Sequence, residues 1–488
     1  MKPKFWITLN ALLLTVLLPL GAVRADDGQL MSMVSQLQKQ MAEMQKTISQ
    51  QNDKIHNLEK REPQIQVAPS SGEAAKAAPM SDYDFNTMLD TATGGAQKWL
   101  KDLKLAGDLR LRYEGFNYGS GNPAETDSRN RYRYRLRLGF EKKFNDDMKI
   151  GFGLASGEGP TITSAAAGAA AVNSDPTSTN TTLDNLFNFK PIYIEKAYGT
   201  YTPKFLSKKG ILDKTEITGG KFNNPFEKGS SDMIWDRDVK PEGVYEKLDW
   251  TLFNSENVTL GAYTTLGQFI LDEDATNGGD SNLYAYQLGI NPVIYTPFFE
   301  RPVDILQAFS LYDYSDYARK NNFTIGGASL ARGNPNLDNN SNELDAGKFK
   351  VFEYYSELAV YPGGLPTRFH FDLAGNLPSD VQPPSLVGED TAFGLGVKLG
   401  GVVKKGDWEL GYQYKHIAAN AVVGAFNDSD FGDGHSGRAG SVIKGAYALT
   451  DSITLNSALF LVDNLNSGTG GIIDQHQRRF QLDLVWKF

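Results

Sequence analysis

The sequence predicts an all-β transmembrane barrel of about 16 antiparallel strands (14–18), preceded by an N-terminal α-helical coiled coil. Three observations carry this expectation. From residue 103 to residue 488, segments of about ten residues alternate apolar and polar side chains, the period of a strand with one apolar face. The apolar side is rich in Tyr, Phe and Trp, and short connections alternate with long ones. A soluble sandwich shares the period, but its core would not tolerate the unpaired charges in mid-strand.

Residues 1–25 are expected to be a signal peptide. Lys2 and Lys4 precede a long apolar stretch, and Ala25 offers a small residue at the cleavage point. The alternative is an uncleaved membrane anchor. Cleavage would remove three cations, the third being Arg24, and would change the net charge from −9 to −12. This acidic balance argues against nucleic acid as a partner.

Residues 26–62 carry a heptad pattern, which predicts a coiled coil. The seam consists of Leu30, Val34, Leu37, Met41, Met44, Ile48, Gln51, Ile55 and Leu58. β-branched residues at one seam position with Leu at the other favour a parallel dimer. The alternative is a single helix that lies on the rest of the protein. Residues 63–102 are expected to be a linker rich in Pro, Ala and Ser, with one possible short helix over residues 81–101.

The barrel is expected over residues 103–488. The predicted strands begin near residues 104, 130, 147, 191, 215, 241, 257, 282, 303, 349, 367, 391, 407, 438, 451 and 477. The connections after even-numbered strands are mostly short, such as Asn145–Asp147 and Pro362–Gly364, whereas those after odd-numbered strands are long. Outer-membrane barrels place their short turns in the periplasm. An even strand count therefore leaves both chain ends, and the coiled coil, in the periplasm.

The segment Arg129–Phe144, RNRYRYRLRLGFEKKF, alternates cationic and apolar residues. An arginine that faces lipid at mid-depth costs roughly 2–4 kcal/mol, so this row must face the lumen, and a row of cations requires a wet lumen. With two arginines of the same parity on the neighbouring strand, the predicted pore-lining residues are Arg110, Arg112, Arg131, Arg133, Arg135 and Arg137. We interpret them as a functional basic wall. The alternative is a set of polar lumen residues balanced by nearby acids.

The last strand ends in Val485-Trp486-Lys487-Phe488. Trp486 and Phe488 resemble the aromatic-ending signal that the outer-membrane assembly machinery recognises. With the signal peptide, the coil and the barrel, the chain resembles the Gram-negative outer-membrane family of putative porins that carries an N-terminal periplasmic coiled coil. The resemblance implies a homotrimer in outer-membrane lipid and passive diffusion of small hydrophilic solutes and ions.

In general porins the third external loop folds inward and narrows the pore, and the third long connection here spans Asn223–Gly243. By this resemblance, the predicted constriction residues are Asp232, Trp235, Asp236, Arg237 and Asp238. An acidic loop that faces a basic wall would set up a transverse field across the pore. The alternative is a plain surface loop.

The expected function is therefore a porin with a water-filled channel, mildly anion-selective through its arginine wall. One alternative is an envelope tether whose coil holds peptidoglycan or a periplasmic protein, although eight strands would suffice for an anchor. Another alternative is a sheath partner of an electron-transfer complex.

No enzyme and no resident cofactor are expected, because no catalytic motif is present, cysteine is absent and the five histidines show no ligand spacing. Weak Ca²⁺ binding stays open for the external loop Asn427–His435. There the spacing of Asp428, Asp430 and Asp433 departs by one residue from that of a calcium-binding loop.

Overall fold

The computed structural model describes residues 103–118, 128–158, 175–187, 189–206, 212–273, 280–315, 317, 324–325, 328–329, 332, 334, 349–377, 389–465 and 476–488. The chain divides into two compact units at residues 86 and 87, and every described residue belongs to the second unit. The predicted signal peptide, coiled coil and linker lie outside the described residues. Among those residues, no helix has the length and apolarity that crossing a membrane would require.

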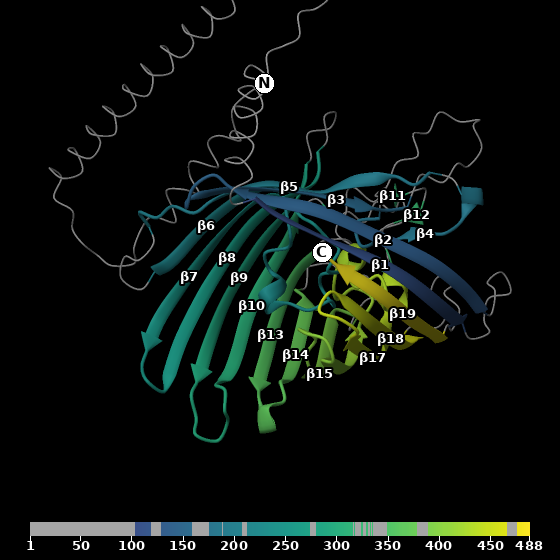
Figure 1. Cartoon of the computed structure of the whole chain (residues 1–488). Coiled ribbons are helices and arrows are strands. Elements are labelled where there is room, and N and C mark those ends of the chain that lie inside the picture. Colours follow the sequence, from purple (N-terminus) through teal and green to yellow (C-terminus); the bar gives the residue numbers. More distant parts are fainter. Residues whose placement is uncertain are drawn as a thin grey trace, which may run out of the picture. The chain divides into compact units, whose positions relative to one another are not determined.

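The described strands form one closed barrel of sixteen antiparallel strands (Figure 1). They are β1 (Leu103–Tyr118), β2 (Ser128–Lys143), β3 (Met148–Ser156), β5 (Ile192–Tyr201), β6 (Leu212–Lys221), β7 (Glu242–Asn254), β8 (Val258–Asp272), β9 (Ser281–Ile294), β10 (Val303–Ser315), β13 (Phe349–Val360), β14 (Thr367–Asn376), β15 (Thr391–Gly400), β16 (Trp408–Ile417), β17 (Arg438–Ala448), β18 (Ile453–Asn464) and β19 (His476–Lys487). The short strand β4 (Thr181–Thr182) pairs with β2, and β11 (Thr324–Ile325) pairs with β12 (Ala328–Ser329).

The barrel closes where the first strand meets the last. β1 and β19 pair from Asp108 opposite Lys487 to Tyr118 opposite Gln477. The backbones of Gly107 and Phe488 exchange two further hydrogen bonds, of 2.8 and 3.1 Å. The predicted count of sixteen strands is confirmed, and each predicted start lies within three residues of the observed one.

The side chains of the strands face alternately outward and inward, as the arginine row predicts. In the β1–β2 ladder, Leu111 lies opposite Tyr134 and Arg112 opposite Arg133. Leu111 and the outward-facing Tyr132 of β2 are exposed, whereas Arg112 and Arg133 are each only 7% exposed. The apolar row therefore covers the outer wall, where lipid would lie, and the arginines point into the barrel.

Two long connections fold into the barrel and build its core. Loop 3 (residues 222–241) follows β6, and loop 7 (residues 418–437) follows β16. Phe226 and Met233 of loop 3 are completely buried, and they belong to one apolar cluster with Phe431 of loop 7. The main apolar core of this protein thus lies inside the barrel, between two loops and the inner wall.

Candidate channel constriction

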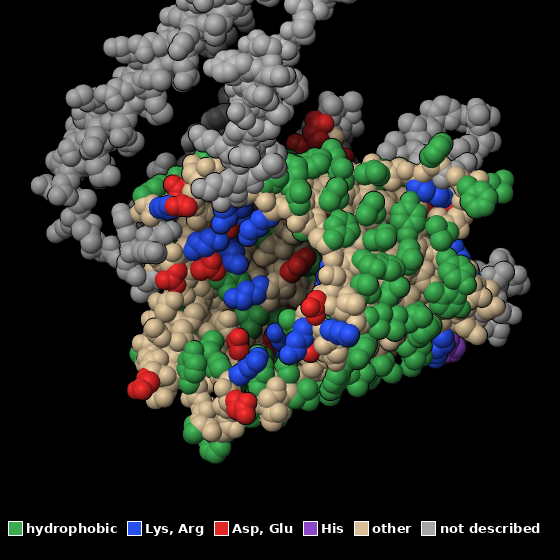
Figure 2. Space-filling model, viewed as in Figure 1, with side chains coloured by type: hydrophobic (Ala, Val, Ile, Leu, Met, Phe, Trp, Pro, Cys, Tyr) green, Lys and Arg blue, Asp and Glu red, His purple; other side chains and the backbone are tan. Residues whose placement is uncertain are grey.

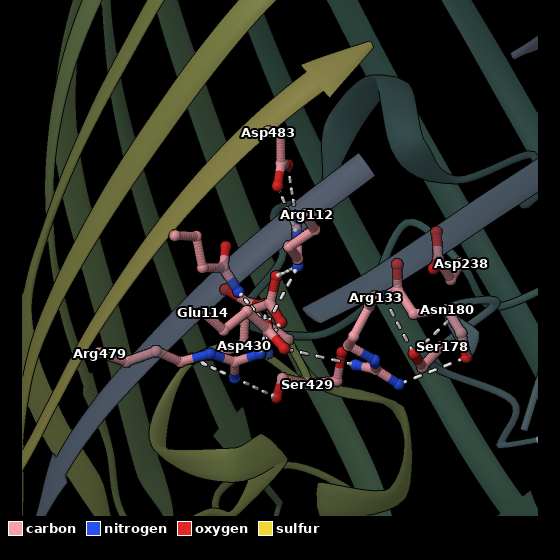
Figure 3. A network of polar contacts seen from close by, with 12 residues as sticks. Arg112, Glu114, Arg133, Ser178, Asn180, Asp238, Ser429, Asp430, Arg479 and Asp483 are labelled. Carbon is pink, nitrogen blue, oxygen red and sulfur yellow. Dashed lines mark hydrogen bonds and ion pairs between the residues drawn. The ribbon is translucent and has the colours of Figure 1, made fainter. Parts of the chain in front are cut away.

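All six predicted pore-lining arginines lie on the lumen side of β1 and β2, close to carboxylates. Arg112 has the most partners: its Nε lies 2.7 Å from Asp483 of β19, and its Nη1 lies 3.0 Å from Asp430 of loop 7. Figure 3 shows Arg112 between these two carboxylates. Arg131 binds Glu114 of β1 at 2.6 Å.

Two further arginines of β2 have one close carboxylate each. Arg133 binds Glu158 at 3.0 Å, and Arg135 binds Asp108 at 2.6 Å. Both side chains are largely buried, so neither guanidinium is a bare cation on the channel wall.

The remaining two arginines reach the loops. Arg137 binds Asp238 of loop 3 at 2.7 Å and Glu195 of β5 at 2.9 Å. Arg110 is paired most weakly: it lies 3.8 Å from a carboxylate of β19 and donates a hydrogen bond of 2.5 Å to Asn180.

Glu114 and Arg479 stand at the centre of this network, and neither is among the site residues that the sequence predicts. Glu114 is fully buried, and its carboxylate lies 2.5 Å from Arg479 of β19 and 2.6 Å from Arg131. Glu114 has the same inward parity as Arg110 and Arg112, so extending that row by two residues would have found it. Arg479 comes from the far end of the chain, and only closure of the barrel brings it here.

The carboxylates of the network at least match its arginines in charge. Its members are Arg110, Arg112, Arg131, Arg133, Arg135, Arg137 and Arg479 on one side and Asp108, Glu114, Glu158, Glu195, Asp238, Asp430, Asp433 and Asp483 on the other. Seven cations thus meet eight carboxylates. Nearby acids therefore balance the arginines, which is the alternative interpretation. The geometry does not favour an exposed basic wall.

Loop 3 lies inside the barrel, but only one of its predicted acids faces the arginine row. Asp238 binds Arg137, whereas Asp232 points to the opposite wall, 3.1 Å from Lys415 of β16 and 3.6 Å from Lys444 of β17. The expectation of one acidic loop opposite one basic wall is therefore wrong in its geometry. The loop crosses the lumen and pairs with cations on both sides.

The middle of loop 3 holds the loop in place. Trp235 is buried, with its ring centroid 5.6 Å from those of Tyr312 and Phe426. Asp236 is also buried and accepts hydrogen bonds from the backbone N–H groups of Ser429 (2.8 Å) and Asp238 (2.7 Å). Both residues therefore position the loop.

The other two predicted residues of loop 3 differ in their surroundings. Arg237 is exposed and lines a cavity next to the loop. Asp238 is mostly buried, and burial alone would raise its pKa, but Arg137, Arg135 and Arg110 together hold the pKa of Asp238 well below its usual value. Asp238 therefore stays ionised and keeps loop 3 attached to the arginine row.

Loop 7 is the second half of the constriction, and no sequence pattern predicted it. Its backbone binds loop 3 twice: Asp236 N donates to Phe426 O at 2.6 Å, and Asp428 N donates to Asp232 O at 3.0 Å. Lys415, which is fully buried, joins both loops to the wall through Asp232 (3.1 Å) and Asp428 (2.7 Å). Loops 3 and 7 thus form one unit, which we call the plug.

The carboxylates of Asn427–His435, whose spacing approaches that of a calcium-binding loop, have cationic partners. Asp428 binds Lys415, and Asp430 binds Arg112 and Arg479. Burial would raise the pKa of Asp430, but Arg479 and Arg112 hold it well below its usual value. Within the described part of the chain, no group of three or more His, Asp or Glu side chains is arranged to hold a metal ion.

Two cavities lie next to the plug, on the side of the short turns. One, of about 570 Å³, is lined by the start of β1, the middle of β5 and the end of β19, including Lys104, Lys196 and Lys487. The other, of about 440 Å³, lies against β13 to β17 and includes Arg237. The face in Figure 2 is hollowed, and Lys and Arg side chains gather there beside Asp and Glu. Charged groups of both signs therefore line a hollow lumen.

A closed sixteen-stranded barrel with an apolar outer wall and a charged, hollow lumen defines an outer-membrane channel. Comparison with known proteins agrees with this class. Residues 123–343 and 371–488 match the family described as "Putative porin", and this match covers more than half of the chain. The chain belongs to this family.

Solved structures of bacterial outer-membrane channels are also similar to this chain. OprB of Pseudomonas putida at high pH is 11% identical over 82% of this chain and 97% of its own, with a TM-score of 0.44. OccK11 (OpdR) of Pseudomonas aeruginosa is 9% identical over 80% and 97%, with a TM-score of 0.38. A mutant of Rhodopseudomonas blastica porin is 8% identical over 79% and 100%, with a TM-score of 0.35. No curated protein matches the chain.

Proposed function

We propose that this channel is a general porin through which small hydrophilic solutes and ions diffuse passively. The observation that carries the proposal is the charged, hollow lumen between the plug and the short turns. Water-filled channels are expected at sixteen strands, whereas an anchor needs far fewer. Liposomes that contain the purified protein should swell in isotonic arabinose faster than in isotonic raffinose. Equal swelling of protein-containing and empty liposomes would contradict the proposal.

We propose a mild preference for anions, set by the cavity of about 570 Å³ more than by the arginine row itself. The row is neutralised by its acids, but this cavity has six cationic side chains, Lys104, Arg135, Arg137, Lys196, Lys240 and Lys487, against the carboxylates of Asp108, Glu141 and Glu195. Cationic side chains are therefore in excess in the described lining. Local charge inside a narrow lumen dominates over net charge, because the field is focused there.

The zero-current potential under a KCl gradient measures this preference. A zero-current potential whose sign shows that Cl⁻ permeates more readily than K⁺ supports the proposal. A potential of the opposite sign would show that the acids of the plug determine selectivity.

We also propose that the chain associates with itself, in line with the homotrimer that the family resemblance implies. The support comes from Glu246 on β7. Tyr245 and Lys247 face the lumen, where Tyr245 donates a hydrogen bond to Glu216 and Lys247 lies over the ring of Tyr263. Glu246 therefore faces outward, and it has no hydrogen bond or ion pair with the described residues.

A carboxylate that faces lipid in mid-strand is costly, and contact with a second copy of the chain would shield it. The chain has no cysteine, so maleimide labelling of a single introduced cysteine measures the accessibility of that position alone. Glu246→Cys should resist a membrane-soluble maleimide, whereas the outward-facing control Phe371→Cys should react. Equal labelling of the two variants would rule out a subunit contact at β7.

A further inference from the structure

The barrel wall has a short seam between β5 and β6. These strands pair only from Ala197 opposite Lys221 to Tyr201 opposite Ile217. The first half of β5 extends beyond the end of β6, where the chain turns inward as loop 3. At this level the wall is therefore completed by loops instead of by a paired strand.

A cavity of about 320 Å³ lies next to the β5–β6 seam, on the side of the long loops, and we call it the side niche. Its described lining comes from the ends of β3, β5, β6, β7, β8 and β9 and from the long loops. Much of that lining is apolar, and it includes Trp235, Val239, Phe269, Leu283 and Phe426. Its volume falls within the range of roughly 300–1,000 Å³ that is usual for small-molecule sites.

The side niche reaches both sides of the wall. On the outer side, Ile194 and Ile270 belong to its lining and are 57% and 48% exposed. On the inner side, Glu195 and Lys240 line both the side niche and the cavity of about 570 Å³ near the short turns. The niche therefore lies between the outer surface of the barrel and its charged lumen, and Glu195 and Lys240 stand between the niche and the lumen cavity.

Most charged groups of the side niche are tied in ion pairs. Lys221 binds Glu242 at 2.5 Å, and Asp175 binds Arg332 at 2.8 Å. Both pairs are neutral as a whole, so each contributes little net charge to a bound molecule.

The inner end of the side niche has one cation without such a partner. Arg137 holds both Asp238 and Glu195, whereas Lys240 has no ion pair with the described residues and donates only to the carbonyl of Arg237, at 2.7 Å. Burial lowers the pKa of Lys240, and the charge of Arg137 adds to this effect, whereas the carboxylates of Asp238, Glu195 and Glu227 oppose it without reversing it. A bound anion would oppose this shift and satisfy the ammonium group.

We propose that the side niche binds a molecule with a short apolar chain and a single carboxylate, with the chain among Phe269, Leu283 and Phe426 and the carboxylate at Lys240. The proposal rests on the channel function and adds a substrate class to it. Apolar surface supplies most of the binding energy, and the ammonium group fixes the orientation. Such a molecule would pass from the outer surface towards the lumen beside the plug.

Octanoate is a suitable probe, and its block of single-channel KCl current is the first measurement. Octanoate should produce concentration-dependent closures, and octylammonium should not. Lys240→Gln should weaken the octanoate block about tenfold, which corresponds to about 1.4 kcal/mol, and Lys240→Arg should retain it. Equal block by octanoate and octylammonium, or an unchanged block in Lys240→Gln, would overturn the assignment of Lys240.

Fluorescence tests occupancy without any current. A brominated octanoate in the side niche should quench the fluorescence of Trp235. The difference in quenching between the wild-type protein and Trp235→Phe measures the part that comes from Trp235. A channel that conducts KCl but shows neither block nor Trp235 quenching would refute the side niche and leave the porin function intact. A folded barrel that does not conduct but still shows Trp235 quenching would refute the porin function and retain the binding site.

Discussion

Replacing Lys415 by Met should loosen the plug. The side chain of Lys415 is fully buried between Asp232 (3.1 Å) and Asp428 (2.7 Å), and its ammonium lies 4.4 Å from the centroid of the Phe431 ring. Methionine keeps much of the volume but leaves Asp428 without its cation, while Lys444 still lies near Asp232. Removing one partner of a buried ion pair typically costs about 3–5 kcal/mol.

The structure indicates where this cost should appear. The substitution leaves the backbone strand pairs of the barrel wall in place. The lost free energy should therefore appear as easier local opening of loops 3 and 7. A loss of about 3 kcal/mol corresponds to roughly a hundredfold faster exchange of amides that open with the plug. Hydrogen exchange followed by mass spectrometry should show this for Asp236 and Asp428, whose N–H groups join the two loops.

The same variant should conduct more current, with more noise, because the loops that narrow the lumen move. Lys398→Met is the matched control for the exchange measurement, because Lys398 lines the cavity next to the plug but pairs with Glu409 of the wall instead of with loop 3 or loop 7. Adding Asp428→Asn to Lys415→Met should restore part of the protection. Unchanged exchange and conductance in Lys415→Met would refute the role of Lys415 in holding the plug.

Three further perturbations test other parts of the structure. Glu114→Gln should lower the thermal unfolding temperature of the barrel in detergent more than Glu158→Gln. Glu114 is fully buried between Arg479 and Arg131, whereas the side chain of Glu158 is 38% exposed. Equal unfolding temperatures of the two variants would contradict the central position of Glu114. Lys104→Glu with Lys196→Glu should move the zero-current potential towards cations, whereas Lys405→Glu, in a short turn, should not; no shift would remove the cavity from the selectivity mechanism. Phe488→Ala should reduce the yield of heat-modifiable barrel in outer membranes compared with Val485→Ala, because the ring of Phe488 packs over Gly107 where β1 and β19 close the barrel; equal yields would contradict this role.

Much of the wall was predictable because it depends on local rules. A period of two and the lipid boundary determine which way each strand side chain faces, so Arg131 to Arg137 and the sixteen strand starts followed from the sequence. The direction of Glu114 was equally available, since it continues the parity of Arg110 and Arg112. The alternating pattern of the strands thus predicts both the number of strands and the side chains that face the lumen.

The partners of the arginines were not predictable, because they depend on closure. Asp483 and Arg479 are far from Arg112 in sequence and reach it only through the β1–β19 seam. Loop 7 carries no periodic signal, and its acidic segment Asn427–His435 resembled a surface loop. Only the contact with loop 3 turns Asp428 and Asp430 into parts of the constriction.

Single-channel current in a planar bilayer tests the central claim most directly. Purified, heat-modifiable protein in symmetric KCl should give large, stable current steps, and Lys415→Met should give larger and noisier ones. A folded barrel that inserts into the bilayer and gives no steps would contradict the assignment of a water-filled channel.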